Sequence, residues 1–220
     1  MERPRRLFDG VYMLGERLAT VNLVGGAKVY NEELFREGEV EYRSWNPYRS
    51  KLSAAILNGM KHMEIKPGSS VLYLGAATGT TASHVSDIVG KKGLVYCIEL
   101  SERNMRELLR VCERRPNMLP ILADANNVSG YADDVGTCDA LYQDVSAKEQ
   151  SQILLRNSRF LKKGGYAYFA IKSQSIDVVK RPEKVFSEAL ESLKGAFEVI
   201  ETVDIEPYDK LHLFAVLKKL

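Results

Sequence analysis

Five residues that can bind or react each lie at the carboxyl end of a predicted strand. They are Gly75, Glu99, Asp124, Asp144 and Lys172. In an open parallel sheet the carboxyl ends of the strands form one edge, and ligands bind beside it. A carboxylate there can accept hydrogen bonds from ligand hydroxyl groups, and a lysine can supply positive charge or, once neutral, accept a proton. We therefore expect these residues to line one ligand crevice.

The elements that must position them alternate between strand and helix patterns from residue 71 onward. This alternation predicts an α/β fold with a central, mostly parallel, Rossmann-like sheet and flanking helices. The strands are expected at 71–74, 94–100, 118–123, 139–143, 166–171, 197–205 and 211–217. The helices are expected at 52–63, from residue 80, and at 102–115, 147–161 and 182–194.

Gly75 and Gly79 bound a turn of small residues between the first of these strands and its helix. The G-x-x-x-G spacing is not a dinucleotide fingerprint, because Ala77 stands in place of the second glycine. No lysine follows Gly79, which excludes a Walker A loop. The pattern resembles the first motif of class I S-adenosylmethionine-dependent methyltransferases. The position of Glu99 supports this resemblance, because an acidic residue about 20 positions after the glycine turn binds ribose hydroxyls in such folds. Taken without Glu99, the two glycines could equally belong to a tight βα connection that binds no ligand.

Residues 1–49 have a different pattern from the rest of the chain. Short strand-like segments at 7–14, 17–23, 28–30 and 40–45 are separated by turn residues. We therefore expect a small antiparallel β subdomain at 1–49 and the α/β domain at 50–220. The small subdomain has too few apolar residues to be stable alone, so it should pack on the larger domain.

The charge balance of the chain is close to neutral. It has 31 basic and 29 acidic residues among 220, a formal net charge of +2, with 45% hydrophobic residues. A protein that binds nucleic acid unaided usually carries a strong basic excess, because phosphate neutralisation supplies much of the affinity. If RNA is the substrate, we expect another component to supply much of the binding.

Neither a membrane segment nor a metal site is expected. No apolar run approaches the roughly 18 residues of a transmembrane helix, and no leader is evident, which favours a cytoplasmic protein without a membrane partner. Cys97, Cys112 and Cys138 are odd in number and widely spaced, as in reduced, buried cysteines. His62 and His84 have no metal-ligand spacing to each other or to the cysteines, so we interpret them as structural.

Eight segments along nearly the whole chain resemble fibrillarin, the RNA ribose 2′-O-methyltransferase family, in its short archaeal form. They are FDGVY (8–12), WNPYRSKLSAAIL (45–57), LYLGAATGTTASHVSD (72–87), GLVYCIELS (93–101), ILADAN (121–126), QDVSAKEQ (143–150), AIKSQSID (170–177) and EPYDKLH (206–212). Two departures concern cofactor contacts. The family usually has serine in place of Thr78, and alanine and glutamine in place of Gln143 and Ala147.

The resemblance implies that the cofactor is S-adenosylmethionine, bound at the crevice described above. It implies that the glycine turn lies against the cofactor, that two threonines contact it, and that Glu99 holds the ribose. It also implies that Asp124 recognises the adenine, and that the segment from Asp144 lies along the methionine part. The cofactor-binding residues are then Gly75, Ala76, Thr80, Thr81, Glu99, Leu100, Asp124, Ala125, Asp144, Val145, Ser146 and Ala147.

A catalytic set of Lys51, Asp144, Lys172 and His212 is also implied by the resemblance. A ribose hydroxyl must lose its proton as it attacks the methyl group, and a lysine can accept that proton only if its pKa falls toward neutrality. Our hypothesis is that Lys172 accepts the proton and Lys51 lowers its pKa and stabilises the alkoxide. Asp144 would fix the lysines, although it raises their pKa, and His212 would position the substrate.

Partners follow from the same resemblance. Such proteins work in a box C/D guide ribonucleoprotein, where a Nop-type scaffold and a kink-turn-binding protein of ribosomal type hold the guide RNA, and base pairing selects the target RNA. The isolated chain is then expected to bind RNA weakly. Two other functions remain open: a small-molecule O-methyltransferase, which would usually need a metal or a closed apolar pocket, and a non-catalytic S-adenosylmethionine-binding scaffold.

Overall fold

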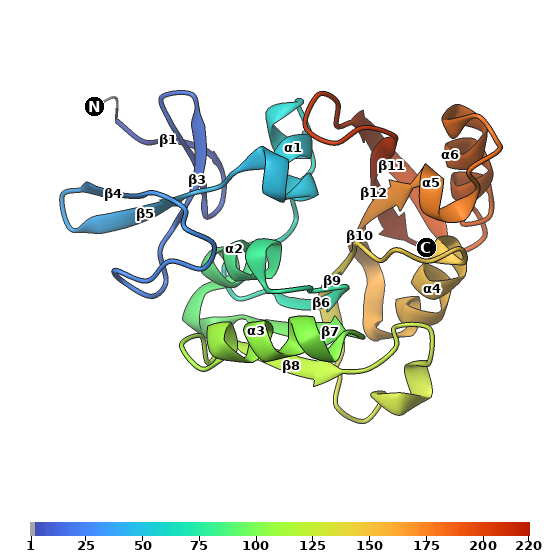
Figure 1. Ribbon diagram of the computed structural model, residues 1–220, viewed down its shortest axis with the longest axis horizontal. Helices are drawn as coiled ribbons and strands as arrows, with labels where there is room; N and C mark the ends of the chain where they lie inside the picture. Colours follow the sequence, from blue (N-terminus) through green and yellow to red (C-terminus); the bar gives the residue numbers. More distant parts are fainter. Residues whose placement is uncertain (1–2) are drawn as a thin grey trace.

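The computed structural model describes residues 3–220 and contains two β-sheets, which lie side by side in Figure 1. The smaller sheet is antiparallel, in the order β1-β2-β3-β5-β4. The larger has the order β11-β12-β10-β9-β6-β7-β8. This confirms the predicted α/β fold with an N-terminal antiparallel sheet. The boundary at 49/50 stays a prediction, and residues 1 and 2 of the expected subdomain lie outside the described residues.

The smaller sheet forms from two hairpins and a central strand. Its strands are β1 (Arg5–Phe8), β2 (Val11–Leu14), β3 (Arg17–Val21), β4 (Leu34–Glu37) and β5 (Val40–Ser44). The predicted strand at 28–30 is wrong, because the Glu32 carboxylate accepts hydrogen bonds from the backbone N–H groups of Val29 and Tyr30. Those amides are therefore unavailable for strand pairing, and Leu34–Glu37 pairs with β5 instead.

The larger sheet positions the predicted crevice. Its strands are β6 (Ser70–Leu74), β7 (Leu94–Glu99), β8 (Met118–Leu122), β9 (Cys138–Gln143), β10 (Leu161–Lys172), β11 (Phe197–Asp204) and β12 (His212–Lys219). Strands β6 to β10 are parallel, and β12 pairs antiparallel with both β10 and β11. From β6 the chain continues to β7 and β8 on one side and then returns to β9 on the other. Ligands bind at such a switch point.

Six α-helices are found within residues 3–220. They are α1 (Lys51–Leu57), α2 (Thr80–Val89), α3 (Glu102–Cys112), α4 (Gln150–Asn157), α5 (Ser173–Ile176) and α6 (Pro182–Glu191). Two predicted ranges were too long. The helix expected at 52–63 ends at Leu57, because Gly59 has a φ of +93°. The helix expected at 147–161 ends at Asn157, and Leu161 already pairs with β9. In this part of the chain no helix is long and apolar enough to span a bilayer.

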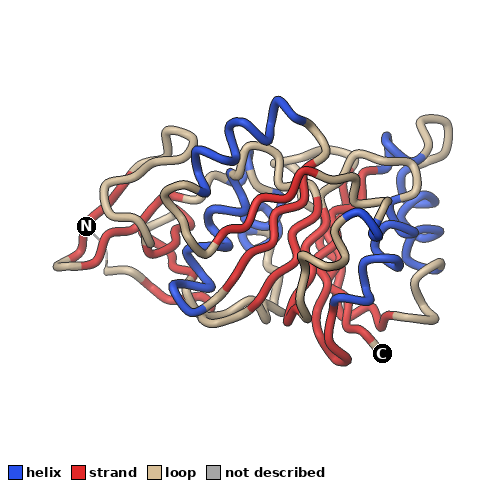
Figure 2. Tube along the Cα trace, turned by 90° about the horizontal axis from the view of Figure 1, so that it is seen from below, coloured by secondary structure: helices blue, strands red, loops and turns tan. Residues whose placement is uncertain are grey.

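Buried side chains cover both faces of the larger sheet. Tyr73 on β6 belongs to one apolar cluster together with α1, α2 and α3, whereas its neighbours Leu72 and Leu74 belong to a second with α4 and α6. Figure 2 shows the strands running through the middle of the molecule with helices to either side. Val11 and Leu18 of the smaller sheet join the first cluster. This confirms the expectation that the N-terminal sheet packs on the larger domain.

A buried ionic network also ties the N-terminal sheet to α2. The Arg43 guanidinium lies 3.2 Å from the Asp87 carboxylate and 3.3 Å from that of Glu32, and all three side chains are fully buried. Asp87 also accepts hydrogen bonds from Arg115 at 2.7 Å and from the Thr20 hydroxyl at 2.8 Å. Buried charges are tolerated only when paired, so these residues specify how the smaller sheet packs on α2.

His84 lies beside this network and lines neither cavity described below. Its imidazole is fully buried, stacks on Trp45, and contacts the hydroxyls of Thr20 and Tyr30 through its two ring nitrogens. Burial, with the nearby Arg43 and Arg115 charges, holds the pKa of His84 well below its usual value. The histidine is therefore neutral and has the structural role expected from its sequence context.

We expect Asp87→Ala to lower the free energy of unfolding by about 3–5 kcal/mol, because it leaves the Arg43 and Arg115 guanidiniums buried without their shared carboxylate. Urea unfolding followed by circular dichroism measures this loss. Glu188→Ala is the control, since it breaks only exposed pairs, with Lys180 and Lys184, and should change stability very little. A loss below about 1 kcal/mol for Asp87→Ala would show that the network is not needed.

Candidate active site

The turn after β6 requires glycine at two positions. Gly75 has a φ of +81°, and a Cβ atom there would lie 2.7 Å from the Asp144 carbonyl oxygen. Gly79 has a φ of +92° and precedes the first residue of α2. Both values are in the left-handed region, which favours glycine. The turn therefore packs directly against the end of β9, where Asp144 begins the next loop.

Glu99 holds this turn through hydrogen bonds. Its side chain is 7% exposed and accepts from the backbone N–H of Ala77 at 2.7 Å and of Ser101 at 2.8 Å. Ala77 has a φ of +49°, uncommon for a residue other than glycine, and this conformation presents its N–H to the carboxylate. Oε1 also accepts from the Asn104 side chain at 3.4 Å, whereas Oε2 keeps a further lone pair with which it can accept a ligand hydroxyl.

All five residues predicted to share one edge line a single cavity of about 670 Å³. Its apolar wall includes Leu100, which is 66% exposed although it is a large apolar side chain. The cavity is lined by Lys51, Gly75, Ala77, Ile98, Glu99, Leu100, Ser101, Asn104, Ala123, Asp124, Ala125, Asp144, Val145, Ser146, Ala147, Ile153 and Lys172. The five residues at strand ends therefore surround one cavity, as their positions in the sequence predicted.

Two lysines share one carboxylate at the edge of this cavity. The Lys172 ammonium lies 2.8 Å from Asp144 Oδ1, and the Lys51 ammonium lies 3.2 Å from the same oxygen. The three side chains are only 13–17% exposed. Lys172 Nζ also donates to the Ser146 hydroxyl at 3.0 Å and to the Asp144 carbonyl at 3.2 Å. The structure thus brings together Lys51, Asp144 and Lys172, which are far apart in sequence.

Asp209 joins the fourth predicted residue to this group. Its carboxylate lies 3.4 Å from the Lys51 ammonium and 3.0 Å from His212 Nδ1. His212 does not line the cavity itself, and its Nδ1 also lies 2.7 Å from the Lys210 carbonyl oxygen. Sequence reasoning did not assign a role to Asp209. The available signal was its place in the EPYDKLH segment, three residues before the histidine.

The electrostatic balance at Lys51 favours its charged form. Burial lowers the pKa of the Lys51 ammonium, but the carboxylates of Asp144 and Asp209 together outweigh burial, and the pKa is raised above its usual value. Lys51 is consequently a cation at neutral pH. The stability gained from this pairing is present below the ordinary lysine pKa of about 10.4 and is lost as the pH rises through the raised value.

Three predicted cofactor residues do not line the cavity. Ala76 is buried, and Thr80 and Thr81 lie at the start of α2. The Thr81 hydroxyl donates to Ser50 Oγ at 3.0 Å, and Ser50 caps α1 just before Lys51. Their direct cofactor contacts stay predictions. Thr81 thus couples the glycine turn to the position of Lys51. Within residues 3–220, no group of three or more His, Cys, Asp or Glu side chains could hold a metal ion.

Comparison with known proteins agrees with the resemblance noted from the sequence. The family model described as Fibrillarin matches residues 2–219. A fibrillarin-like rRNA/tRNA 2′-O-methyltransferase from Thermococcus onnurineus is 52% identical over 226 aligned positions, with both chains fully covered. The crystal structure of Aeropyrum pernix fibrillarin with natively bound S-adenosyl-L-methionine superposes with a TM-score of 0.90, 43% identity and 98% coverage of each chain. The fibrillarin chain in the crystal structure of a fibrillarin/Nop5p complex superposes with a TM-score of 0.91 and 35% identity. The match covers 98% of this chain and all of that chain.

We expect Asp144→Asn and Asp209→Asn each to lower the pKa of Lys51, with the larger fall for Asp144→Asn, because its carboxylate contributes more to the raised value. Burial lowers the pKa of Lys51 and the two carboxylates raise it, so the pKa falls when either carboxylate loses its charge. The titration of ¹³C-labelled lysine side chains by NMR measures the change, with Lys51→Arg identifying the signal. Asp177→Asn, in an exposed loop, is the control. An unchanged titration in Asp144→Asn would contradict the assignment of these charges.

Proposed function

The chain belongs to the fibrillarin family, and from that premise we propose that it transfers a methyl group from S-adenosylmethionine to ribose 2′-hydroxyl groups of RNA. One observation carries the proposal for this chain. Two ammonium groups lie within 3.2 Å of one carboxylate oxygen, at the edge of a cavity lined by Gly75 and Glu99. This places positive charge and a basic side chain beside a site suited to a nucleoside.

The cavity fits the cofactor by its donors and its size. A volume of about 670 Å³ is within the range of small-molecule sites. Glu99 offers carboxylate lone pairs for ribose hydroxyls, and Leu100 and Ile153 offer an apolar wall for a flat ring. We infer that Asp124 and Ala125 bind the adenine end and that residues 144–147 bind the methionine end. When bound, S-adenosylmethionine supplies an electrophilic methyl group on a sulfonium.

Each charged side chain then has a distinct task in our proposal. Lys51 stays cationic between Asp144 and Asp209, so it can stabilise the negative charge that develops on the ribose oxygen. Lys172 is left as the acceptor of the hydroxyl proton. Its ammonium contacts the Asp144 carboxylate and donates to the Asp144 carbonyl and the Ser146 hydroxyl, which fixes Nζ at the edge of the cavity.

We further propose that the chain works as the catalytic subunit of a box C/D ribonucleoprotein in the cytoplasm. A Nop-type scaffold, a kink-turn-binding protein and guide RNA would position the target RNA. Two observations support this: the net charge of +2 is small for a protein that binds RNA alone, and the fibrillarin structure compared above contains Nop5p. Base pairing to the guide would then select the nucleotide.

Reconstitution tests the function directly. The chain is combined with a Nop-type scaffold, a kink-turn-binding protein, box C/D guide RNA and complementary target RNA, and labelled S-adenosylmethionine is added. We expect one ribose of the target to carry a 2′-O-methyl group, located by mass spectrometry. The chain alone and a non-complementary guide are the controls. Efficient site-specific methylation by the chain alone at moderate salt would contradict the need for the assembly.

In the reconstituted particle, Lys172→Ala should reduce the methylation rate by about 10²–10⁴-fold, because it removes the proposed proton acceptor. Calorimetry should show that S-adenosylmethionine still binds, which separates catalysis from cofactor loss. Lys163→Ala is the matched control, since this exposed lysine lies near the start of the same strand, at the opposite end from Lys172. A Lys172→Ala protein with near-normal turnover would refute the role of Lys172.

A further inference from the structure

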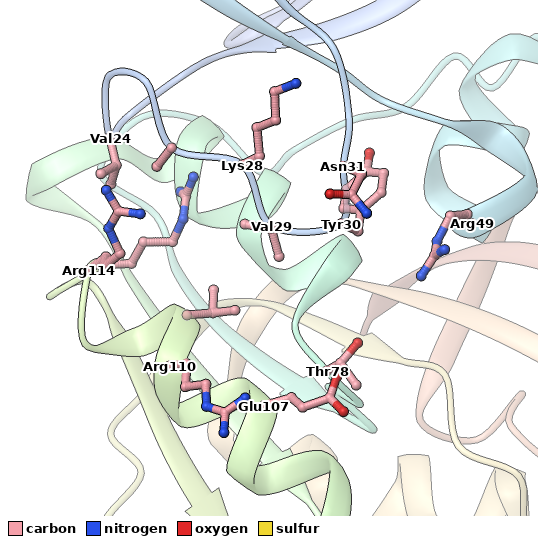
Figure 3. A pocket seen from close by; sticks show the side chains of 13 residues that line it. Val24, Lys28, Val29, Tyr30, Asn31, Arg49, Thr78, Glu107, Arg110 and Arg114 are labelled. Carbon is pink, nitrogen blue, oxygen red and sulfur yellow. The ribbon is translucent and has the colours of Figure 1, made fainter.

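A second cavity, of about 500 Å³, lies between the N-terminal loop and α3 (Figure 3). Its charged lining is mainly basic. Lys28 comes from the loop, Arg49 from the 3-10 turn before α1, Arg110 from α3 and Arg114 from the turn that follows α3, with Glu107 the one exposed acidic side chain among them. Tyr30 forms part of the same wall, and the Arg49 guanidinium lies 5.4 Å from the centre of its ring.

The basic residues of α3 continue beyond the cavity along one helix face. Four exposed arginines are spaced at intervals of three, four and four residues. They are Arg103, Arg106, Arg110 and Arg114. Side chains at this spacing form a single row, here opposite the buried face that contains Leu108. From Arg103 to Arg114 the row is about 16 Å long, at about 1.5 Å per residue.

These charges are not neutralised inside the protein. Among residues 3–220, no carboxylate lies within 4 Å of the charged group of any of the four α3 arginines, of Lys28 or of Arg49. Arg115 lines the cavity as well, and its Nη2 is buried without a hydrogen-bond partner in the same part of the chain.

The basic cavity adjoins the candidate active site at three places. Arg49 lines the basic cavity and Lys51, two residues on, lines the active site. Thr78 and Ala77 are neighbours on the glycine turn, one in each lining. On α3, Asn104 faces the active site and the next turn faces the basic cavity. The Cα atoms of Arg49 and Lys51 are at most about 7 Å apart, so a polymer with its ribose at Lys51 could continue toward Arg49.

We propose that this basic cavity and the α3 arginine row bind the phosphodiester backbone of the RNA whose ribose occupies the active site. The inference rests on the proposed function and adds a binding site to it. Arginine favours phosphate because its planar guanidinium donates in pairs, and phosphate contacts fix the register of a nucleic acid without reading its sequence. RNA is favoured over an acidic protein segment because the cavity that contains Arg110 and Arg114 adjoins the active site at Arg49 and Thr78.

The test measures binding of a short labelled RNA duplex to the full chain by fluorescence anisotropy at several salt concentrations. Arg110→Gln/Arg114→Gln should weaken binding about tenfold at low salt. It should also reduce the slope of log K against log[salt] by about two, near the value for two lost phosphate contacts. Arg110→Lys/Arg114→Lys should keep most of the slope. The matched control is Lys91→Gln/Lys163→Gln. These two exposed lysines lie near the amino ends of strands β7 and β10, whereas the active site lies at the carboxyl ends.

The outcomes separate this site from the proposed function. Calorimetric S-adenosylmethionine binding should be unchanged in Arg110→Gln/Arg114→Gln, which also shows that the variant is folded. In the reconstituted particle its KM for target RNA should rise while kcat is retained. RNA affinity and salt slope equal to those of the control variant would overturn the proposal, even if the particle still methylates RNA. Lost scaffold binding with unchanged RNA affinity would overturn it in favour of a protein interface.

Discussion

The Asp144 carboxylate is the interaction on which the proposed chemistry depends. It holds two ammonium groups, from the start of α1 and the end of β10, on one side of a ligand cavity. Three charges that are mostly buried need one another, because each would be costly to bury alone. Removing the carboxylate would leave two like charges close together. The site is therefore stable only while α1, β9 and β10 are held in this arrangement.

Ser50 and Thr81 explain how α1 is held. Ser50 caps α1 and accepts a hydrogen bond from Thr81 at the start of α2, so Lys51 is fixed relative to the glycine turn. The N-terminal sheet in turn fixes α2, through the buried pairing of Arg43 with Asp87. A sheet that contributes no residue to the active-site cavity thus determines the position of one of its lysines. It also provides the loop that forms one wall of the basic cavity.

Sequence patterns predicted the crevice because strand periodicity reports where strands end, and Glu99 and Lys172 end strands β7 and β10. They could not predict contacts between segments far apart in the chain. Asp209 reaches Lys51 across 158 positions, and no local pattern encodes such a pairing. The residue types at 28–30 predict a strand, but the carboxylate of the neighbouring Glu32, which the buried Arg43 holds in place, binds the amides of this loop.

The small net charge and the basic cavity are compatible because charge acts locally. At about 0.1 M ionic strength, exposed charges separated by more than about 10 Å are largely screened from one another. Acidic residues such as Glu183 and Glu188 on α6 lie across the molecule from the N-terminal loop, as Figure 1 shows, so they do not cancel the α3 arginines. A nearly neutral chain can therefore contact RNA phosphates beside its active site. The small net charge of +2 fits our proposal that a scaffold and a guide supply the rest of the RNA binding.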